Sequence, residues 1–326
     1  MLISSFSIAL VSFLFSVFFI VVLKKFSKVR GVLLDKQIPS VGGLALGLSF
    51  FLVCFLYWFP ASTMPSYVAG FLIASGVVLV FGFVDDILGL PVISKFFVQI
   101  LATAILVSFG LKTHIVYIGT IGNILVTLLW VVGLTNAFNL LDVMDGLAAS
   151  VAIIASVIFA FSALLTGNIP ILVLSLALAG AAFGFILFNF PPAKVYLGNA
   201  GSHFLGFLFS VIAIAISYAT AKNKIALLAP ILILGFPILD TVFLVFMRIR
   251  CGKSAFNKSN DHLALRFLKS GYSKQKALAV MFVVALLFGL CGLSLLGTPG
   301  LLSVLLAVFA LVFSLILFRK MSVVEV

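Results

Sequence analysis

SYVAGFLIASGVVLVFGFVDD, residues 66–86, is the stretch that determines the fold of this chain. Its first 19 residues carry no charge, and Asp85 and Asp86 follow directly. About 20 mostly apolar residues are enough to cross the hydrocarbon core of a bilayer as a helix. The stretch therefore predicts a membrane-spanning helix that ends in two adjacent carboxylates.

Similar apolar runs fill the rest of the chain. The 326 residues are 64% hydrophobic and 9% charged, whereas a soluble domain is about 25% charged. We count eleven runs, at 3–23, 41–59, 66–84, 94–110, 122–138, 147–166, 170–188, 203–221, 225–247, 277–296 and 299–318. We therefore expect one all-α polytopic membrane domain, residues 1–326, with about 11 transmembrane helices. The count is 10 if the sixth and seventh runs form one span, since only Gly167, Asn168 and Pro170 separate them.

Lysine and arginine are distributed unevenly between the segments that join these runs. If the N-terminus lies outside, 17 of the 20 basic residues lie inside, and only Lys112, Lys222 and Lys224 lie outside. Cytoplasmic loops carry the excess of Lys and Arg in membrane proteins. We therefore expect the N-terminus outside and the C-terminus in the cytoplasm. The net charge of +12 follows from this topology, and we expect no nucleic-acid partner.

The eight acidic residues gather on the same side. In this topology none lies in an outside loop, and Asp240 alone lies within a run. The rule for Lys and Arg says little about Asp and Glu, so the clustering needs another cause. We expect a site on the cytoplasmic face, formed by the loops at about 24–40, 85–95, 139–147, 189–203 and 248–276.

Asp85 and Asp86 are the first candidates for chemistry. Carboxylates at a helix C-terminus oppose the helix dipole, so their position calls for a reason. Hard cations such as Mg2+ bind carboxylate oxygens together with substrate phosphates, which favours a metal site here. Lys95 follows and can neutralise a phosphate; snorkelling of its ammonium to the interface is the alternative.

A second polar cluster ends the fifth run. Asn136 and Asn139 are three residues apart, as are Asp142 and Asp145, which places each pair on one face if the helix continues. Polar groups at membrane depth are costly unless they line a cavity or a site. Simple capping of the sixth helix by Asp145 is the alternative.

Two further segments carry weaker signals. The turn Gly198-Asn199-Ala200-Gly201-Ser202 precedes the eighth run, where backbone N–H groups can hold a phosphate, although it can equally be only a loop. Asp240 is an intramembrane acid, which is a functional hypothesis by default. Arg248 is two turns later and can be its partner, so a purely structural ion pair stays open.

In this order, the segments resemble the polyprenyl-phosphate N-acetylhexosamine-1-phosphate transferases. The resemblance extends from about residue 39 to 266. It rests on Pro39 to Gly43, Gly82 to Asp86 with Lys95 and Gln99, Asn136 to Gly146, Asn189 to Gly206, Pro237 to Thr241 with Arg248 and Arg250, and Asp261-His262-Leu263.

The resemblance implies a reaction in which a polyprenyl phosphate oxygen attacks the β-phosphate of a UDP-sugar and UMP leaves. It implies a bacterial inner-membrane enzyme with Mg2+ as cofactor and Mn2+ as the alternative cation. The implied catalytic residues are Asp85, Asp86, Asp142 and Asp145. The implied metal ligands are Asp85, Asp86, Asp142 and Asn199. The implied substrate contacts are Lys95, Asn136, Asn139, Asn189, Lys194, Arg248 and His262.

Two positions depart from the family pattern. Asn199 stands where the family has a metal-binding aspartate, and an amide oxygen brings no charge, so we expect weaker Mg2+ binding. Ala264 and Leu265 stand where the family has two histidines. A catalytically inactive homologue that binds polyprenyl phosphate or scaffolds the pathway is therefore an alternative, and a transporter is a further one. The sugar, the polyprenol length and the choice between monomer and homodimer stay open.

Overall fold

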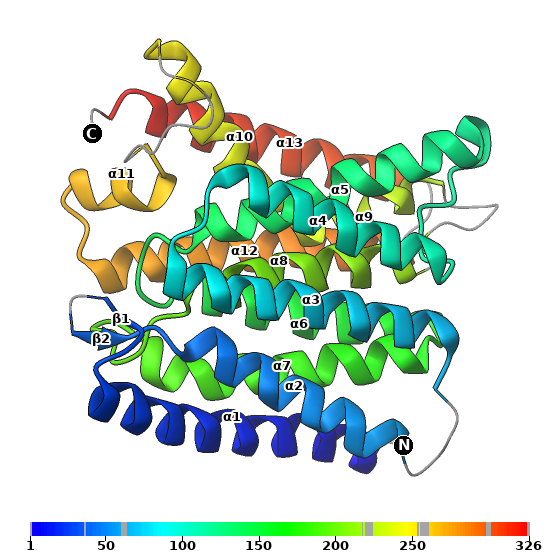
Figure 1. Cartoon of the computed structure of the whole chain (residues 1–326). Coiled ribbons are helices and arrows are strands. Elements are labelled where there is room, and N and C mark those ends of the chain that lie inside the picture. The colour runs from blue at the N-terminus through cyan, green and yellow to red at the C-terminus, as the bar shows by residue number, and fades with distance from the viewer. Residues whose placement is uncertain are drawn as a thin grey trace.

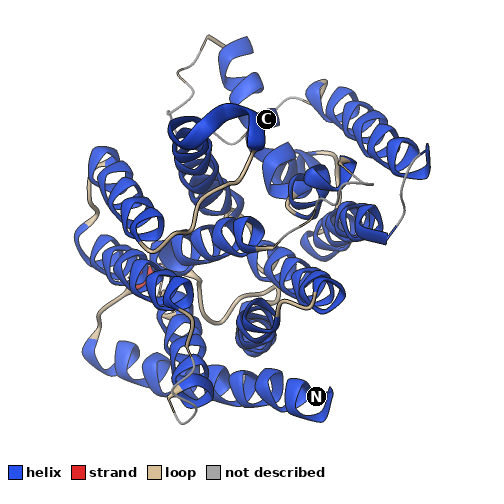
Figure 2. Cartoon of the chain, turned by 90° about the vertical axis from the view of Figure 1, so that its right-hand side faces the viewer, coloured by secondary structure: helices blue, strands red, loops and turns tan. Residues whose placement is uncertain are grey.

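The computed structural model describes residues 2–35, 37–59, 64–216, 218, 224–252, 254, 261–297 and 301–324. Most of these residues are helical, and the strands of the described chain form one hairpin of two strands with two residues each (Figure 2). The elements are α1 Leu2–Arg30, β1 Leu34–Asp35, β2 Ile38–Pro39, α2 Gly42–Trp58, α3 Ser66–Leu88, α4 Val92–Ser108, η1 Val116–Ile118, α5 Gly119–Leu141, α6 Leu147–Thr166, α7 Ile169–Asn189, α8 Gly198–Ala215, η2 Ile225–Leu228, α9 Ala229–Ile233, α10 Gly235–Arg250, α11 Leu263–Lys269, α12 Lys274–Gly297 and α13 Leu301–Ser322.

Each of the eleven apolar runs coincides with a helix or, at 225–247, with a bent group of helices. Eight helices in the described chain are long and apolar enough to cross a membrane: α1, α3, α5, α6, α7, α8, α12 and α13. The bent group can add a ninth crossing, and α2 and α4 are shorter apolar helices. The chain is therefore a multi-pass, all-α membrane protein. The number of crossings and the orientation of the termini stay predictions.

The sixth and seventh runs form two helices rather than one. Gly167 ends α6 in the left-handed conformation, with φ +71°, which glycine adopts without a steric penalty. Asn168 then caps α7 by accepting a hydrogen bond from the backbone N–H of Ile171. The two helices pack against each other along their length.

The ninth run, which the sequence analysis counts as one transmembrane helix, is bent. Helices η2 and α9 meet α10 at an angle of 73°. Pro237 has no N–H to donate to Ile233, and its ring would clash with that carbonyl in a continuous helix. The break falls at Leu234, between these two residues.

Helices α6, α7 and α8 form the interior, whereas α1 and α13 are mostly exposed. Helix α1 is fastened to α7 by two buried hydroxyl groups: Ser12 donates to Ala177 O at 2.5 Å, and Ser16 donates to Ala181 O at 2.8 Å. Such serine contacts are a usual means of joining helices in lipid, where hydrophobic burial provides no driving force between them.

The connecting segments that matter for function lie at one end of the bundle. In Figure 1 the β1–β2 hairpin, α11 and the C-terminus lie toward the left end, and the N-terminus lies at the right. The segment between α7 and α8 is tied to the hairpin and to α2, because Tyr196 N donates to Pro39 O and Gly42 N donates to Tyr196 O. The loops therefore form one connected layer over the helix ends.

Helix α8 packs closely against α3 at Gly82. A Cβ placed on Gly82 would lie 2.6 Å from the Cα of Ala200, so only glycine allows this approach. Gly76, on the same helix, has only Phe51 in ordinary contact range, at 3.8 Å. The α3–α8 contact thus depends on one glycine, one turn before the two aspartates.

We predict that Gly82→Ala separates α3 from α8 and destabilises the protein by about 1–3 kcal/mol, as overpacking commonly does. Gly76→Ala is the matched control, and we expect it to be neutral or slightly stabilising because alanine favours a helix. Thermal unfolding in detergent measures both. Equal melting temperatures for the two variants would show that the close approach at Gly82 is not required.

Candidate active site

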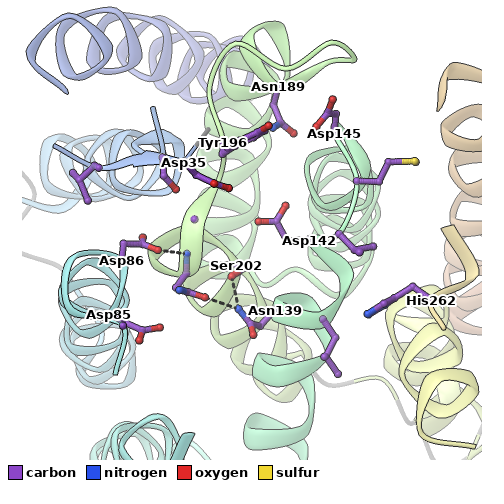
Figure 3. A pocket seen from close by; sticks show the side chains of 18 of the residues that line it. Asp35, Asp85, Asp86, Asn139, Asp142, Asp145, Asn189, Tyr196, Ser202 and His262 are labelled. Atoms are coloured by element: carbon purple, nitrogen blue, oxygen red, sulfur yellow. Dashed lines mark hydrogen bonds between the residues drawn. The ribbon is translucent and has the colours of Figure 1, made fainter. Parts of the chain in front are cut away.

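A cavity of about 1370 Å³ opens at the loop end of the bundle (Figure 3). Residues from the β1–β2 hairpin, α3, α5, α8, α10 and the segments before α6 and α11 line it. Six carboxylates contribute to its wall, from Asp35, Asp85, Asp86, Asp142, Asp145 and Asp261. Among the described residues of the wall, Arg248 and Lys274 are the lysine and arginine side chains that accompany them. A cavity of this charge needs cations before it can accept an anionic ligand.

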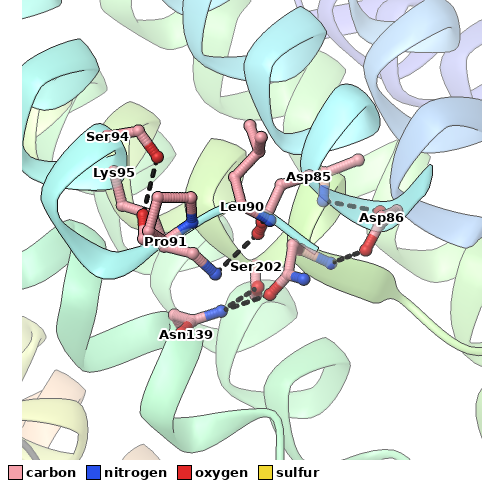
Figure 4. Close-up of polar contacts among 10 residues, drawn as sticks. Asp85, Asp86, Leu90, Pro91, Ser94, Lys95, Asn139 and Ser202 are labelled. Carbon is pink, nitrogen blue, oxygen red and sulfur yellow. Dashed lines mark hydrogen bonds and ion pairs between the residues drawn. The ribbon is translucent and has the colours of Figure 1, made fainter. Parts of the chain in front are cut away.

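Asp86 is held by the first turn of α8 (Figure 4). Its Oδ1 accepts the backbone N–H of Asn199 at 2.7 Å, and its Oδ2 accepts that of Ala200 at 2.9 Å. These N–H groups have no partner inside the helix, and the helix dipole favours a negative charge there. Gly198, with φ +75°, makes the turn, and a Cβ on it would lie 2.7 Å from Asp86 Oδ2. The local sequence is therefore built to hold this carboxylate.

Asp85 faces the other way, toward α4. It is buried, its Oδ2 lies 2.6 Å from Lys95 Nζ, and its Oδ1 accepts the N–H of Leu90 at 2.7 Å. The short turn after α3 brings Lys95 back to this position (Figure 4). The Lys95 ammonium neutralises the Asp85 carboxylate, whereas the two oxygens of Asp86 accept only backbone N–H groups, so Asp85 is the less available metal ligand of the two. Its evident role here is to orient the Lys95 ammonium.

Asp142 extends into the cavity from the turn after α5 (Figure 3). Within the described chain its half-buried carboxylate has neither a hydrogen bond nor an ion pair. Burial raises the pKa of Asp142 to about 7, and the negative charges of Asp86 and Asp145 add to this shift. An acid of this kind is poised to gain a cation, because its charge is not yet balanced.

Asn139 connects α5 to α8. Its amide Nδ2 donates to Asn199 Oδ1 at 3.1 Å and to Ser202 Oγ at 2.9 Å (Figure 4). Asn136, one turn earlier, donates to Gln99 Oε1 at 2.8 Å and to the backbone of Val132. The two asparagines therefore join α5 to different neighbours, α8 and α4.

Asn189 and Asp145 hold the turn between α5 and α6. Asn189 is buried; its Oδ1 accepts the N–H of Gly146 at 2.9 Å, and its Nδ2 donates to Val195 O at 3.0 Å. Asp145 Oδ2 accepts the N–H of Ala193 at 3.3 Å and lies 3.6 Å from Lys274 Nζ. Both residues therefore connect this turn to the segment between α7 and α8.

His262 approaches the cavity from the opposite wall (Figure 3). Its Nδ1 lies 3.3 Å from Asp240 Oδ2, and Asp240 Oδ1 accepts the N–H of Leu263 at 2.9 Å. Asp240 thus caps α11 and orients the imidazole. His262 is therefore a direct partner of the intramembrane acid Asp240. Asp240 and Asp261 also interact electrostatically with Arg248.

The cavity brings together nine of the predicted site residues: Asp85, Asp86, Asn139, Asp142, Asp145, Asn189, Asn199, Arg248 and His262. Lys95 and Asn136 lie behind the wall, where they contact Asp85 and Gln99. Lys194 does not line the cavity, and its predicted substrate contact stays a prediction. Its neighbours Ala193 and Val195 are buried, so its own side chain points outward and is exposed.

Four polar residues of the cavity wall are not among the candidates that the sequence predicts: Asp35, Ser40, Tyr196 and Lys274. Asp35 and Ser40 flank the hairpin, and Tyr196 precedes α8. The hydrogen bonds between the hairpin and the α7–α8 segment bring them together. Their positions in loops near Gly42 and Gly198 were the available signal, but no spacing rule joins segments so distant in sequence.

A divalent cation fits this donor set only if water or substrate phosphates supply its remaining ligands. In the described chain, no three His, Cys, Asp or Glu side chains are arranged to hold a metal ion. Asp142 lacks a balancing charge, Asp86 retains free lone pairs, and Asn199 offers an amide oxygen. Mg2+ is commonly bound by one or two carboxylates, with water and substrate phosphates completing its shell. The residues present fit that mode of binding.

Comparison with known proteins identifies the family. Residues 68–217 match the model of glycosyl transferase family 4. A probable undecaprenyl-phosphate N-acetylglucosaminyl 1-phosphate transferase of Bacillus subtilis is 30% identical over 288 residues, which cover 86% of this chain and 79% of the relative. This chain belongs to glycosyl transferase family 4. The matched segment runs from α3 to α8 and so includes Asp86, Asp142 and Asn199.

Other family members are similar over most of their length. A decaprenyl-phosphate N-acetylglucosaminephosphotransferase of Mycobacterium tuberculosis is 33% identical over 282 residues, covering 75% of this chain and 69% of the relative. A phospho-N-acetylmuramoyl-pentapeptide-transferase of Staphylococcus carnosus is 26% identical over 281 residues, covering 78% and 84%.

We predict that Asn189→Ala lowers the melting temperature by several degrees. The change leaves the Gly146 N–H and the Val195 carbonyl without their partner, and each orphaned buried group costs about 1–3 kcal/mol. Lys194→Ala, five residues further on, is the control, and its exposed side chain should tolerate the change within about 0.5 kcal/mol. Thermal unfolding in detergent compares the two. A normal melting temperature for Asn189→Ala would contradict its role as a clamp.

Proposed function

We propose that this protein transfers N-acetylhexosamine-1-phosphate from a UDP-sugar to a polyprenyl phosphate and releases UMP. The observation that carries the proposal is the acidic cavity in which Asp86, at the N-terminus of α8, faces the unbalanced carboxylate of Asp142. The relatives in Bacillus subtilis and Mycobacterium tuberculosis are named as transferases of N-acetylglucosamine phosphate to polyprenyl phosphates. The family segment contains both aspartates.

The size and position of the cavity suit two substrates of different solubility. Its volume of about 1370 Å³ exceeds the roughly 300–1,000 Å³ of ordinary small-molecule sites. It can therefore admit a nucleotide-sugar together with a lipid phosphate. The site lies where helix ends meet loops, so a lipid acceptor can enter from the bilayer and a soluble donor from the aqueous side. The two substrates can thus meet there without either leaving its own phase.

The basic groups around the cavity can bind the phosphates. Lys95 presents an ammonium oriented by Asp85, Arg248 lies in the wall, and Lys274 stands at the rim beside Asp145. Phosphoryl transfer depends mainly on positioning and charge neutralisation, since the transition state spreads negative charge over the phosphoryl oxygens. These side chains supply positive charge on opposite sides of the cavity.

Mg2+ is the cofactor that we propose, with Mn2+ as the alternative, and Asp86, Asp142 and Asn199 are the residues that would hold it. When bound, the cation supplies neutralisation of the phosphate charges and of the carboxylate excess. Asp86 contributes a carboxylate fixed by two backbone N–H groups, so it needs little reorganisation. Asn139 restrains the Asn199 amide by a hydrogen bond to its oxygen.

We propose the bacterial inner membrane as the location, with the cavity on the cytoplasmic side. The helix ends near the cavity carry basic residues in their last turns: Lys28 and Arg30 in α1, Arg248 and Arg250 in α10, and Arg319 and Lys320 in α13. This charge matches the positive-inside rule. It supports a C-terminus in the cytoplasm and a site that is open to nucleotide-sugars on that side.

The test is UMP release by purified protein in detergent, with undecaprenyl phosphate, Mg2+ and a panel of UDP-sugars. We expect release that requires both lipid and metal, and the donor that supports it names the sugar. Asp86→Asn, in protein with an unchanged elution profile, should lose at least about 100-fold in rate and excludes a contaminating activity. No release from any donor, together with retained binding of undecaprenyl phosphate, would establish the non-catalytic alternative that Asn199, Ala264 and Leu265 raise.

The raised pKa of Asp142 predicts a pH-dependent stability that Mg2+ reverses. Without the cation, the folded protein retains the Asp142 proton up to about pH 7, whereas the unfolded chain loses it near pH 4. The melting temperature of the wild type, relative to Asp142→Asn, should therefore fall as pH rises from 4 to 7 and stay low above it. Mg2+ should raise the wild-type value at pH 8 and leave the variant unchanged. An equal Mg2+ response in both proteins would remove Asp142 from the metal site.

A further inference from the structure

Arg266 of α11 is a buried arginine that the proposed chemistry does not use. It is 2% exposed and lies outside the cavity wall. Its Nη2 lies 2.8 Å from Asp261 Oδ1, and its Nε donates to the Asp261 carbonyl at 3.3 Å. Its guanidinium also lies over the Phe243 ring, 5.3 Å from the centroid. A charge buried in this way is costly unless each of its donors is satisfied.

The third guanidinium nitrogen of Arg266, Nη1, is bound by the end of α13. Its Nη1 donates to the carbonyl of Met321 at 3.0 Å and to that of Val324. The last carbonyls of a helix have no partner within the helix and carry the negative end of its dipole. Arg266 therefore caps α13 through a charge-assisted contact, across 55 residues of sequence.

Aromatic contacts reinforce this junction. The ring of Phe318 in α13 meets Phe243 edge-on, with centroids 4.9 Å apart, and meets Phe246 in the same manner at 5.0 Å. Elsewhere α13 is mostly exposed, with only 11% of its spanning window buried. The C-terminal end of an otherwise peripheral helix is thus fastened to α10 and α11.

The junction ends at the cavity wall. Asp261 and His262 line the cavity, and each is held from behind by a different partner. Asp240 of α10 orients His262, and Arg266 holds Asp261 by both its carboxylate and its carbonyl. Without Arg266, His262 would keep its contact with Asp240, whereas Asp261 would lose both of its contacts with Arg266.

We propose that Arg266 is a positioning residue through which the C-terminal end of α13 fixes Asp261, beside His262, for the nucleotide-sugar. This rests on the proposed function, because it assigns the Asp261–His262 wall to the donor. The residues at 321–324 then set donor affinity without touching the substrate. Because Arg266 contacts backbone carbonyls of Met321 and Val324, no side-chain substitution in this tail removes those contacts. Truncation does.

Kinetics separate positioning from general damage. Arg266→Ala, and a chain truncated after Lys320, should each raise KM for the UDP-sugar about 10-fold or more. KM for undecaprenyl phosphate should change less than about threefold in both. Arg266→Lys should recover only part of the loss, because lysine keeps the charge but not the planar fork of donors. Lys269→Ala is the matched control: it removes an exposed charge from the same helix and should behave as the wild type.

The two lesions should also be non-additive. If Arg266 and the tail act as one unit, combining Arg266→Ala with the truncation should raise donor KM no further than either change alone. A multiplied effect would show two independent roles and overturn the proposal. Equal increases in KM for both substrates would also overturn it, since they indicate general damage.

Hydrogen exchange provides a readout that does not require turnover. In detergent, the amides of Leu263–Lys269 should exchange at least about 10-fold faster in full-length Arg266→Ala and in the truncated chain than in the wild type. The amides of α6 and α7 should stay protected in all three proteins. Unchanged exchange in α11 would refute the positioning role, and faster exchange throughout would show that Arg266 supports the whole fold instead. This result stands even if the wild type releases no UMP, so failure of the proposed function and failure of the junction are distinguishable.

Discussion

The site depends on one interaction, in which the carboxylate of Asp86 in α3 accepts hydrogen bonds from the first turn of α8. It satisfies the N–H groups of Asn199 and Ala200, and it places a negative charge at the positive end of a helix. The contact is possible because Gly82 lets α3 approach α8 closely and because Gly198 makes the preceding turn. Two glycines and one acid therefore determine where the cavity wall stands.

Around this contact, polar groups at the membrane boundary are satisfied mainly by one another. Asn139 joins α5 to α8, and Asn189 joins the turn before α6 to the segment before α8. Lys95 of α4 forms an ion pair with Asp85. In lipid, an unpaired polar group costs several kcal/mol, so each of these residues constrains the position of a second helix or loop. The same network that stabilises the loop end of the bundle also shapes the cavity.

Asp142 is the exception to this satisfaction. Its raised pKa shows that the protein holds a carboxylate where burial and two neighbouring aspartates oppose its charge. Natural proteins retain such a cost mainly at functional sites. The neighbouring Asp145 has Lys274 beside it, and Asp85 has Lys95, so the imbalance is local to Asp142. A bound cation would balance this charge.

The sequence by itself determined the membrane class, the positions of the long helices in the described chain and nine of the residues that line the cavity. Lipid requires about 20 apolar residues per crossing, so runs such as 66–84 are visible without any knowledge of packing, and acids that interrupt them are conspicuous. Spacing along one helix could not show that Asp85 turns to Lys95 while Asp86 turns to α8, because adjacent residues point to different neighbours. Nor could it place Lys194 outside the cavity or join Arg266 to the end of α13. These outcomes depend on contacts between segments far apart in sequence, and only the tertiary structure decides them.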